Sequence, residues 1–226
     1  MSEADETLGV EAEALPRLPA GRHGLPRAFV VENQRQRIAA GMIAVVSERG
    51  YHEATISDIV AAGGVSRRTF YGYFKTKEEC FVETFEIVAS FLLETIAEAG
   101  GEERSWAGRV RTRLAALLDA FAANPDLARF ELGGPPAAGG EIAARAYDFL
   151  ERLLEALVAG RPKSARRPPR ATEQSLAGGL AALVLAKAEA GEGEEMGVLL
   201  PDLVELVLTS YLGRERAVAE AEAARG

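Results

Sequence analysis

Hydrophobic residues recur every three or four positions along most of the chain, which is the spacing of one face of an α-helix. Glycine- and proline-rich stretches separate these periodic segments and mark helix ends or loops. The longer segments predict helices at residues 28–49, 77–99, 103–123, 125–132, 141–159, 172–190 and 197–212. Together with two short helices at residues 55–77, they predict an all-α fold of about nine helices.

Residues 55–77 carry the signals of two short helices joined by a tight turn. Thr55 followed three residues later by Asp58 is a capping-box pattern that starts the first helix. Gly63 and Gly64 end that helix, because glycine adopts the left-handed conformation that a helix exit requires. Ser66 then provides the N-cap of the second helix.

The second short helix breaks an electrostatic rule. Arg67 and Arg68 lie in its first turn, where a cation beside the positive end of the helix dipole costs roughly 0.3–1 kcal/mol. Phe70 and Phe74, four residues apart, predict the buried face, so Arg68 points to the opposite side. Positions that break a local rule are candidates for function.

The outward side of this helix is rich in hydrogen-bond donors. Arg68 lies at its centre, and the flanking and following positions are Arg67, Thr69, Tyr71, Tyr73, Lys75 and Lys77. Such side chains bind phosphate oxygens and the base edges of a major groove. Two helices around a glycine turn with an outward basic face form the helix-turn-helix pattern of DNA-binding proteins. A plain surface helix of an all-α protein is the alternative.

Composition and charge narrow the class of protein. Apolar residues make up 48% of the 226 residues, enough for a packed core, and the formal net charge is −8. Residues 20–79 nevertheless carry +3, whereas residues 1–19 carry −4 and residues 80–226 carry −7. A basic region on an acidic body fits a small nucleic-acid reader attached to a larger domain.

The chain lacks the signals of secretion, membrane insertion and catalysis. Its single cysteine, Cys80, excludes an internal disulfide, and the longest uncharged run has about 13 residues against the roughly 20 that span a bilayer. The two histidines, His23 and His52, give no metal or catalytic spacing. We therefore expect a cytoplasmic protein without enzymatic activity, metal or cofactor, and without membrane attachment.

Residues 31–85 resemble the N-terminal DNA-binding domain of the TetR family of transcriptional regulators. The resemblance rests on five segments in order and at the family's spacing. They are Glu48-Arg49-Gly50-Tyr51, Thr55-Ile56-Ser57-Asp58-Ile59-Val60, Gly63-Gly64-Val65-Ser66, Thr69-Phe70-Tyr71 and Phe74-Lys75-Thr76-Lys77-Glu78-Glu79.

We expect the chain to divide into three parts. Residues 1–27 are rich in Glu, Ala, Pro and Gly and lack periodicity, so they are expected to form a disordered arm. The resemblance implies that residues 28–76 form the helix-turn-helix DNA-binding domain and residues 77–226 a helical domain for ligand binding and dimerisation. Arg22 and Arg27 at the end of the arm are placed to enter a minor groove, or to lie in a solvated tail.

The resemblance also assigns roles to residues. Thr55 and Ser57 are expected to approach phosphates, and Tyr71 and Lys77 to hold the DNA backbone. The residues implied to face the groove are Arg67, Arg68, Thr69 and Tyr73. Gly72 and Tyr73 depart from the larger residue and the histidine frequent in the family, which changes the expected base preference and leaves the phosphate contacts in place.

The function implied is a ligand-responsive homodimeric regulator, a repressor that an unidentified small-molecule effector releases from a palindromic double-stranded DNA operator. The alternative is a helical protein that binds small molecules and does not read DNA. The apolar helices at residues 172–190 and 197–212 predict the dimer contact, with core packing inside one subunit as the alternative. Five aromatic residues are candidates either for an effector cavity or for plain core: Trp106, Phe121, Phe130, Tyr147 and Phe149.

Overall fold

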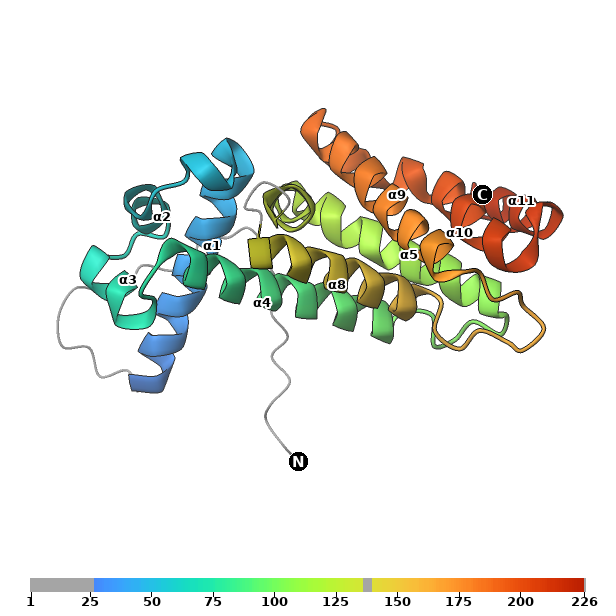
Figure 1. Cartoon of the computed structure of the whole chain (residues 1–226), viewed down its shortest axis with the longest axis horizontal. Helices are drawn as coiled ribbons and strands as arrows, with labels where there is room; N and C mark the ends of the chain where they lie inside the picture. Colours follow the sequence, from blue (N-terminus) through green and yellow to red (C-terminus); the bar gives the residue numbers. More distant parts are fainter. Residues whose placement is uncertain (1–26, 136–139, 226) are drawn as a thin grey trace.

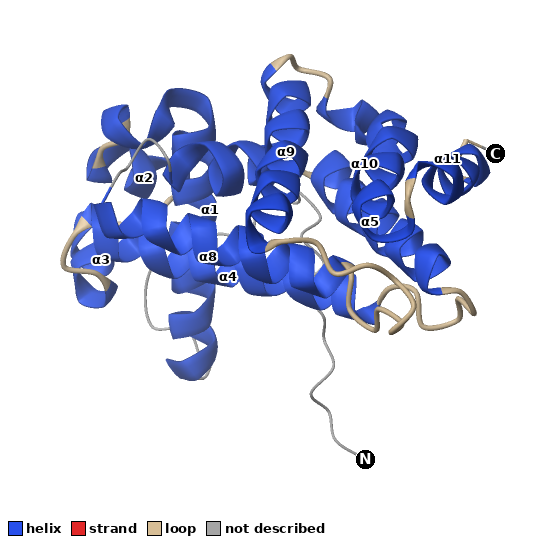
Figure 2. Ribbon diagram, turned by 45° about the vertical axis from the view of Figure 1, so that its right-hand side comes forward, coloured by secondary structure: helices blue, strands red, loops and turns tan. Residues whose placement is uncertain are grey.

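The computed structural model describes residues 27–135 and 140–225, with side chains from residue 33 onward. Every regular element within these ranges is helical, which confirms the all-α class (Figures 1 and 2). The elements are α1 (Arg27–Glu53), α2 (Ile56–Ala62), α3 (Arg67–Tyr73), α4 (Lys77–Glu98), α5 (Trp106–Ala123), α6 (Pro125–Ala128), the π-helical turn η1 (Arg129–Gly133), α8 (Gly140–Leu157), α9 (Arg170–Glu189), the 3-10 segment η2 (Gly193–Leu199), α10 (Leu200–Leu212) and α11 (Arg214–Ala223).

Helices α1, α2 and α3 form a small N-terminal unit at one end of the molecule (Figure 1). Ile38 and Met42 on α1 are completely buried, as are Ile59 on α2 and Phe70 on α3. Phe70 and Phe74, the two residues that the sequence predicted for the buried face of α3, are both buried. The regular α1 geometry is interrupted at Gly50, where the sequence predicted the helix to end.

The turn between α2 and α3 depends on two glycines for different reasons. Only Gly64 has a positive φ, 59°. Gly63 has a helical φ of −71°, so the prediction that it needs the left-handed region was wrong. A Cβ at Gly63 would lie 2.4 Å from the Arg37 carbonyl oxygen of α1. Glycine is therefore required there because the backbones of α1 and α2 almost touch.

Arg37 on α1 closes the open end of α2. Its Nε donates a 3.0 Å hydrogen bond to the Gly63 carbonyl oxygen, and its guanidinium also bonds the Gly64 carbonyl oxygen. The residue is 9% exposed. The last carbonyls of a helix lack partners within the helix and carry partial negative charge, so a buried guanidinium stabilises them.

The C-terminal part of the molecule is a second helical layer built around α4 and α5. Helix α4 leads away from the N-terminal unit, and α8 packs along it (Figure 1). Helix α5 contacts α4, α10 and η2, so it lies at the centre of this domain. The apolar face of α4 is buried and consists of Phe81, Phe85, Val88, Leu92 and Ile96.

Several helix ends differ from the prediction. Helix α5 begins three residues late because the Ser105 hydroxyl caps it. Helix α9 begins at Arg170, directly after Pro169, so Thr172 does not cap it. The predicted loop at residues 133–140 is helical at its start, up to residue 135. Capping residues and proline set where these helices begin and end, and the spacing of hydrophobic residues alone does not locate those ends.

The chain ends in an additional helix that the sequence pattern did not separate. Gly213 has a φ of 84° and divides α10 from α11. Helix α11 packs on α10 and touches α5, with Ala217 and Ala221 fully buried in the contact. The expectations for the arm at residues 1–26 and for the centre of the loop at residues 136–139 lie outside the described residues.

None of the helices within the described ranges has both the length and the apolar character needed to cross a bilayer.

The close approach of α1 and α2 at Gly63 predicts that replacing glycine by alanine has opposite effects on stability at Gly63 and at Gly72. Gly63→Ala is expected to lower the free energy of unfolding by roughly 1–3 kcal/mol, because its methyl group would collide with backbone. Gly72→Ala on α3, where a Cβ meets nothing within 4 Å, is expected to raise it by roughly 0.5–1 kcal/mol. Urea unfolding measures both, and equal effects of the two variants would contradict the close approach of α1 and α2.

Candidate nucleic-acid interface

Helix α2 starts with the capping box that the sequence predicted. The Asp58 amide donates to the Thr55 hydroxyl at 3.2 Å, and the Thr55 amide donates back to the Asp58 carboxylate at 3.2 Å. The Thr55 hydroxyl also donates to that carboxylate at 2.6 Å. These hydrogen bonds from Thr55, together with nearby Arg49, lower the pKa of Asp58. The Thr55 hydroxyl hydrogen is therefore used within the protein.

Helix α3 turns its aromatic face inward and its polar face outward. Ser66 caps it by accepting from the Thr69 amide at 3.0 Å. Phe70 and Phe74 are buried, whereas Arg67 and Arg68 are exposed and Tyr71 is 57% exposed. The side chains predicted to face outward at the start of α3 therefore do so, although two cations share a helix N-terminus.

Arg67 joins the two short helices on their outer side. Its guanidinium donates to the hydroxyl of Ser57 at the start of α2. Within the described residues, no carboxylate lies within ion-pair distance of Arg67, Arg68 or Lys75. Lys75, which follows α3, is exposed. We call the polar surface formed by these side chains the α3 face; it consists of Ser57, Arg67, Arg68, the half-buried Thr69, Tyr71 and Lys75.

Two of the predicted contact residues are turned toward the protein. The Tyr73 hydroxyl donates to the side-chain oxygen of Gln34 on α1 at 2.9 Å, and Tyr73 is half-buried. The helical wheel placed Tyr73 beside the outer face, but it could not show that α1 passes within reach. The hydroxyl thus ties α3 to α1.

Lys77 is held still more firmly. Its ammonium donates to the carbonyl oxygens of Tyr51 at 2.7 Å and Ala54 at 2.9 Å, and it lies 4.4 Å from the Tyr51 ring centroid. Burial lowers the pKa of Lys77. These carbonyls belong to the end of α1 and the connection to α2. The structure therefore gives Lys77 a capping position and leaves Lys75 as the exposed lysine.

The comparison with known families bears on this unit. The sequence pattern of the family described as "Bacterial regulatory proteins, tetR family" matches residues 39–84. That segment runs from the middle of α1 into α4 and contains the whole helix-turn-helix. This part of the chain is therefore similar to the helix-turn-helix domain of the tetR family of bacterial regulatory proteins.

A protein with a related sequence is the "Uncharacterized HTH-type transcriptional regulator YvdT" of Bacillus subtilis (strain 168). The two are 35% identical over 72 residues, which is 31% of this chain and 37% of the relative. The sequence likeness thus spans about a third of that protein's length.

Solved structures extend the likeness to about three quarters of the chain. The fatty acid degradation regulator FadR of Bacillus halodurans superposes with a TM-score of 0.66 at 22% identity, covering 76% of this chain and 97% of its own. FadR of Bacillus subtilis in complex with stearoyl-CoA gives 0.62 at 19% identity, covering 79% and 98%. At such identities the likeness shows a shared fold.

The position of Lys77 predicts a structural effect for its removal. Lys77→Met is expected to lower the free energy of unfolding by roughly 1–3 kcal/mol, because buried carbonyl oxygens lose a charged donor. Lys75→Met, at an exposed position, is expected to change it by less than about 0.5 kcal/mol. Thermal or urea unfolding distinguishes them, and an unaffected Lys77→Met would show that the ammonium does not cap α1.

Proposed function

We propose that this chain is a homodimeric repressor of the TetR family that reads a palindromic operator through the α3 face and leaves it when a small molecule binds the C-terminal domain. The observation that carries the proposal is the α3 face itself, where Arg67, Arg68 and Lys75 lack carboxylate partners among the described residues. Cations concentrated on one exposed helix of an acidic protein are suited to a polyanion.

The proposed contacts divide into two kinds. Arg68 at the centre of the face is suited to a base edge, since a guanidinium bonds guanine with two hydrogens. The phosphate contacts fall to Ser57, Arg67, Tyr71 and Lys75, with Thr69 beside them in the groove. Three of the expected contact residues have structural roles in the proposal, because their hydrogen bonds are used within the protein. Tyr73 ties α3 to α1, Lys77 caps the end of α1, and the Thr55 hydroxyl caps α2.

The surface of α9 and α10 supports a dimer. Leu183 on α9 is 43% exposed and Leu206 on α10 is 37% exposed, although both are large and apolar. Helix α9 also exposes small residues, Gly178 and Ala182, that permit close helix approach. A dimer formed with a second copy on this surface would present two α3 faces. Two α3 faces about 34–36 Å apart would match successive major grooves of DNA.

Release by an effector follows from linkage. The dimer is proposed to have two forms, one whose α3 faces fit the operator and one whose α3 faces do not. A ligand that binds the second form more tightly lowers the affinity for the operator, and the size of the effect is set by the ratio of the ligand's affinities for the two forms. The complex of a fold relative with stearoyl-CoA supports a ligand-responsive domain here. The ligand's identity does not carry over at 19% identity.

Removing the central arginine tests the DNA-reading role. Arg68→Ala is expected to weaken binding to the selected operator by roughly 1–3 kcal/mol and to relax the base preference at one position of each half-site. Arg104→Ala, an exposed arginine outside the N-terminal unit, is the matched control and should bind normally. Selection from genomic fragments at fixed salt supplies the operator, and gel shifts measure the variants. Recovery of no preferred fragment would favour the ligand-binding protein that does not read DNA.

Placing a charge on the proposed dimer surface tests the assembly. Leu206→Glu is expected to raise the dimer dissociation constant at least tenfold, because burying an unpaired carboxylate costs several kcal/mol. Ile87→Glu on α4, also about half exposed, should leave it unchanged. Sedimentation equilibrium reports both values. A dimer that tolerates Leu206→Glu would locate its interface elsewhere.

A further inference from the structure

Glu131 in η1 is a carboxylic acid that the fold buries without a partner. It is 1% exposed, and neither oxygen of its side chain has a hydrogen-bond partner among the described residues. A buried polar group without a partner is costly, and a charged group costs more than a neutral one. The ionised form of Glu131 is therefore disfavoured in this arrangement of the helices.

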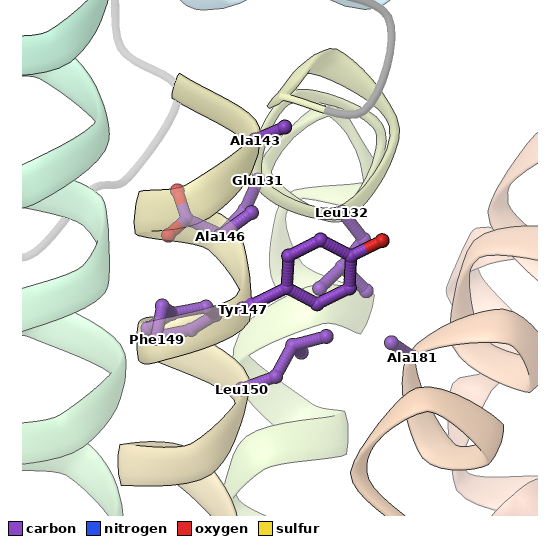
Figure 3. A pocket seen from close by; sticks show the side chains of 8 residues that line it. All are labelled: Glu131, Leu132, Ala143, Ala146, Tyr147, Phe149, Leu150 and Ala181. Atoms are coloured by element: carbon purple, nitrogen blue, oxygen red, sulfur yellow. The ribbon is translucent and has the colours of Figure 1, made fainter. Parts of the chain in front are cut away.

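The Glu131 carboxylate faces the contact between α8 and α4. Figure 3 shows it extending past α8 toward α4, away from a small, mainly apolar cavity between η1, α8 and α9. The cavity therefore supplies no partner for the carboxylate. Of the five aromatic residues considered for an effector cavity, two line this one, Tyr147 and Phe149, whereas Trp106, Phe121 and Phe130 belong to the hydrophobic core.

Charged groups on α4 and α8 act on Glu131 in opposite directions. Burial raises the pKa of Glu131 well above its ordinary value, Glu86 on α4 adds to the rise, and Arg152 on α8 opposes it. Arg145 on α8 is engaged twice, with Glu86 at 3.3 Å and with Glu141 at 3.0 Å. Arg152 is held more loosely, since its single ion pair among the described residues is with Glu86 at 3.7 Å. Arg152 is thus the cation available to an ionised Glu131.

The other elements packed against this segment bring apolar groups to it. A Cβ at Gly133 would lie 3.3 Å from Leu185 of α9, and a Cβ at Gly134 would lie 3.4 Å from Val46 of α1. On the segment itself, Arg129 is paired with Asp126 at 2.8 Å. At these contacts an ionised Glu131 would meet no free cation, so it gains one only by moving toward α8 and α4.

The segment that carries Glu131 holds the two parts of the molecule together. Residues Arg129–Gly133 form a π-helical turn, a rare geometry that is frequent at functional sites. Phe130 packs on Phe81 of α4, and Gly134 lies against both Phe81 and Val46 of α1. A displacement of η1 would therefore disturb its contacts with α1 and α4, the helices on either side of the helix-turn-helix.

We propose that Glu131 is a pH-sensitive switch. Its neutral form keeps η1 packed against α1 and α4, and its ionised form draws η1 toward Arg152 and loosens that packing. The step transfers one proton from the carboxyl group to water, and the carboxylate gains the guanidinium as its partner. The regulatory meaning of the switch rests on the proposed function, whereas the switch itself does not require DNA.

Hydrogen exchange of the full-length protein without DNA, followed by mass spectrometry, tests the switch. At pH 6 the amides of residues 129–134 should exchange equally in the natural protein and in Glu131→Gln, whose side chain cannot ionise. At pH 9 they should exchange at least about tenfold faster in the natural protein, because ionisation opens the segment. Comparing the two proteins at one pH cancels the intrinsic effect of pH on exchange. Equal exchange at both pH values would overturn the proposal.

Three further variants identify Glu131 as the titrating group through the pH midpoint of this opening. Arg152→Met should raise the midpoint, because the cation that favours the ionised carboxylate is lost. Glu86→Gln should lower it, because a neighbouring negative charge is lost. Glu155→Gln, an exposed carboxylate in the same surface groove as Glu86 and Arg152, is the control and should leave it unchanged. Shifts of the first two in the same direction, or no shift, would reject the role of Glu131.

Infrared spectroscopy of the natural protein covers the case in which Glu131→Gln fails to fold. At pH 6 the spectrum should contain the carbonyl band of a protonated, buried carboxyl group, because exposed carboxyl groups are ionised at that pH. The band should disappear over the pH range in which η1 opens. A band that persists at pH 9, or one that is absent at pH 6, would contradict a switch at Glu131.

Operator binding measures the regulatory part separately. In gel shifts with the selected operator at fixed salt, the natural protein should lose at least about tenfold more affinity between pH 6 and pH 9 than Glu131→Gln loses. Equal losses beside an intact switch would overturn the regulatory part. Because the exchange and infrared measurements contain no DNA, their failure rejects the switch, whereas failure to select any operator rejects the proposed function.

Discussion

The close contact of α1 with α2 is the constraint on which the N-terminal unit depends. Gly41 and Gly63 let the two backbones meet, and Arg37 binds the carbonyls at the end of α2 across the same contact. Because a turn of only a few residues follows, the end of α2 sets where α3 can begin. The orientation of the whole α3 face therefore derives from one glycine contact and one buried guanidinium.

The basic residues of this region have three different roles that their identity does not reveal. Arg37 and Lys77 bind main-chain carbonyls at helix ends. Arg35 and Arg49 pair with the carboxylates of Glu83 and Asp58. Among the residues whose side chains the structure describes, the other cations of this region, Arg67, Arg68 and Lys75, lie on the α3 face. The local charge of +3 is therefore not spread evenly over the surface, because these exposed cations gather on α3 and directly after it.

The π-helical turn connects the two halves of the proposed mechanism. Phe130 within it packs on Phe81 of α4, with ring centroids 4.9 Å apart, and Phe81 packs on Tyr51 at the same distance. Tyr51 lies beneath the Lys77 ammonium. A change in η1 would therefore meet tightly packed aromatic rings that lead to the end of α1.

The sequence by itself determined the helical class, the capping box of α2, the cap of α3 and the outward arginines, because caps and hydrophobic spacing act within a few residues of the chain. Only the tertiary structure decided that Tyr73 and Lys77 turn inward, because their partners are far away along the chain. Gln34 lies 39 residues before Tyr73, and the carbonyl groups bound by Lys77 lie 23 to 26 residues before it. The same holds for Glu131, which reads as an ordinary surface acid on a short helix. Its side chain is buried because η1, α8 and α4, which are far apart in the sequence, pack together around it in the folded protein.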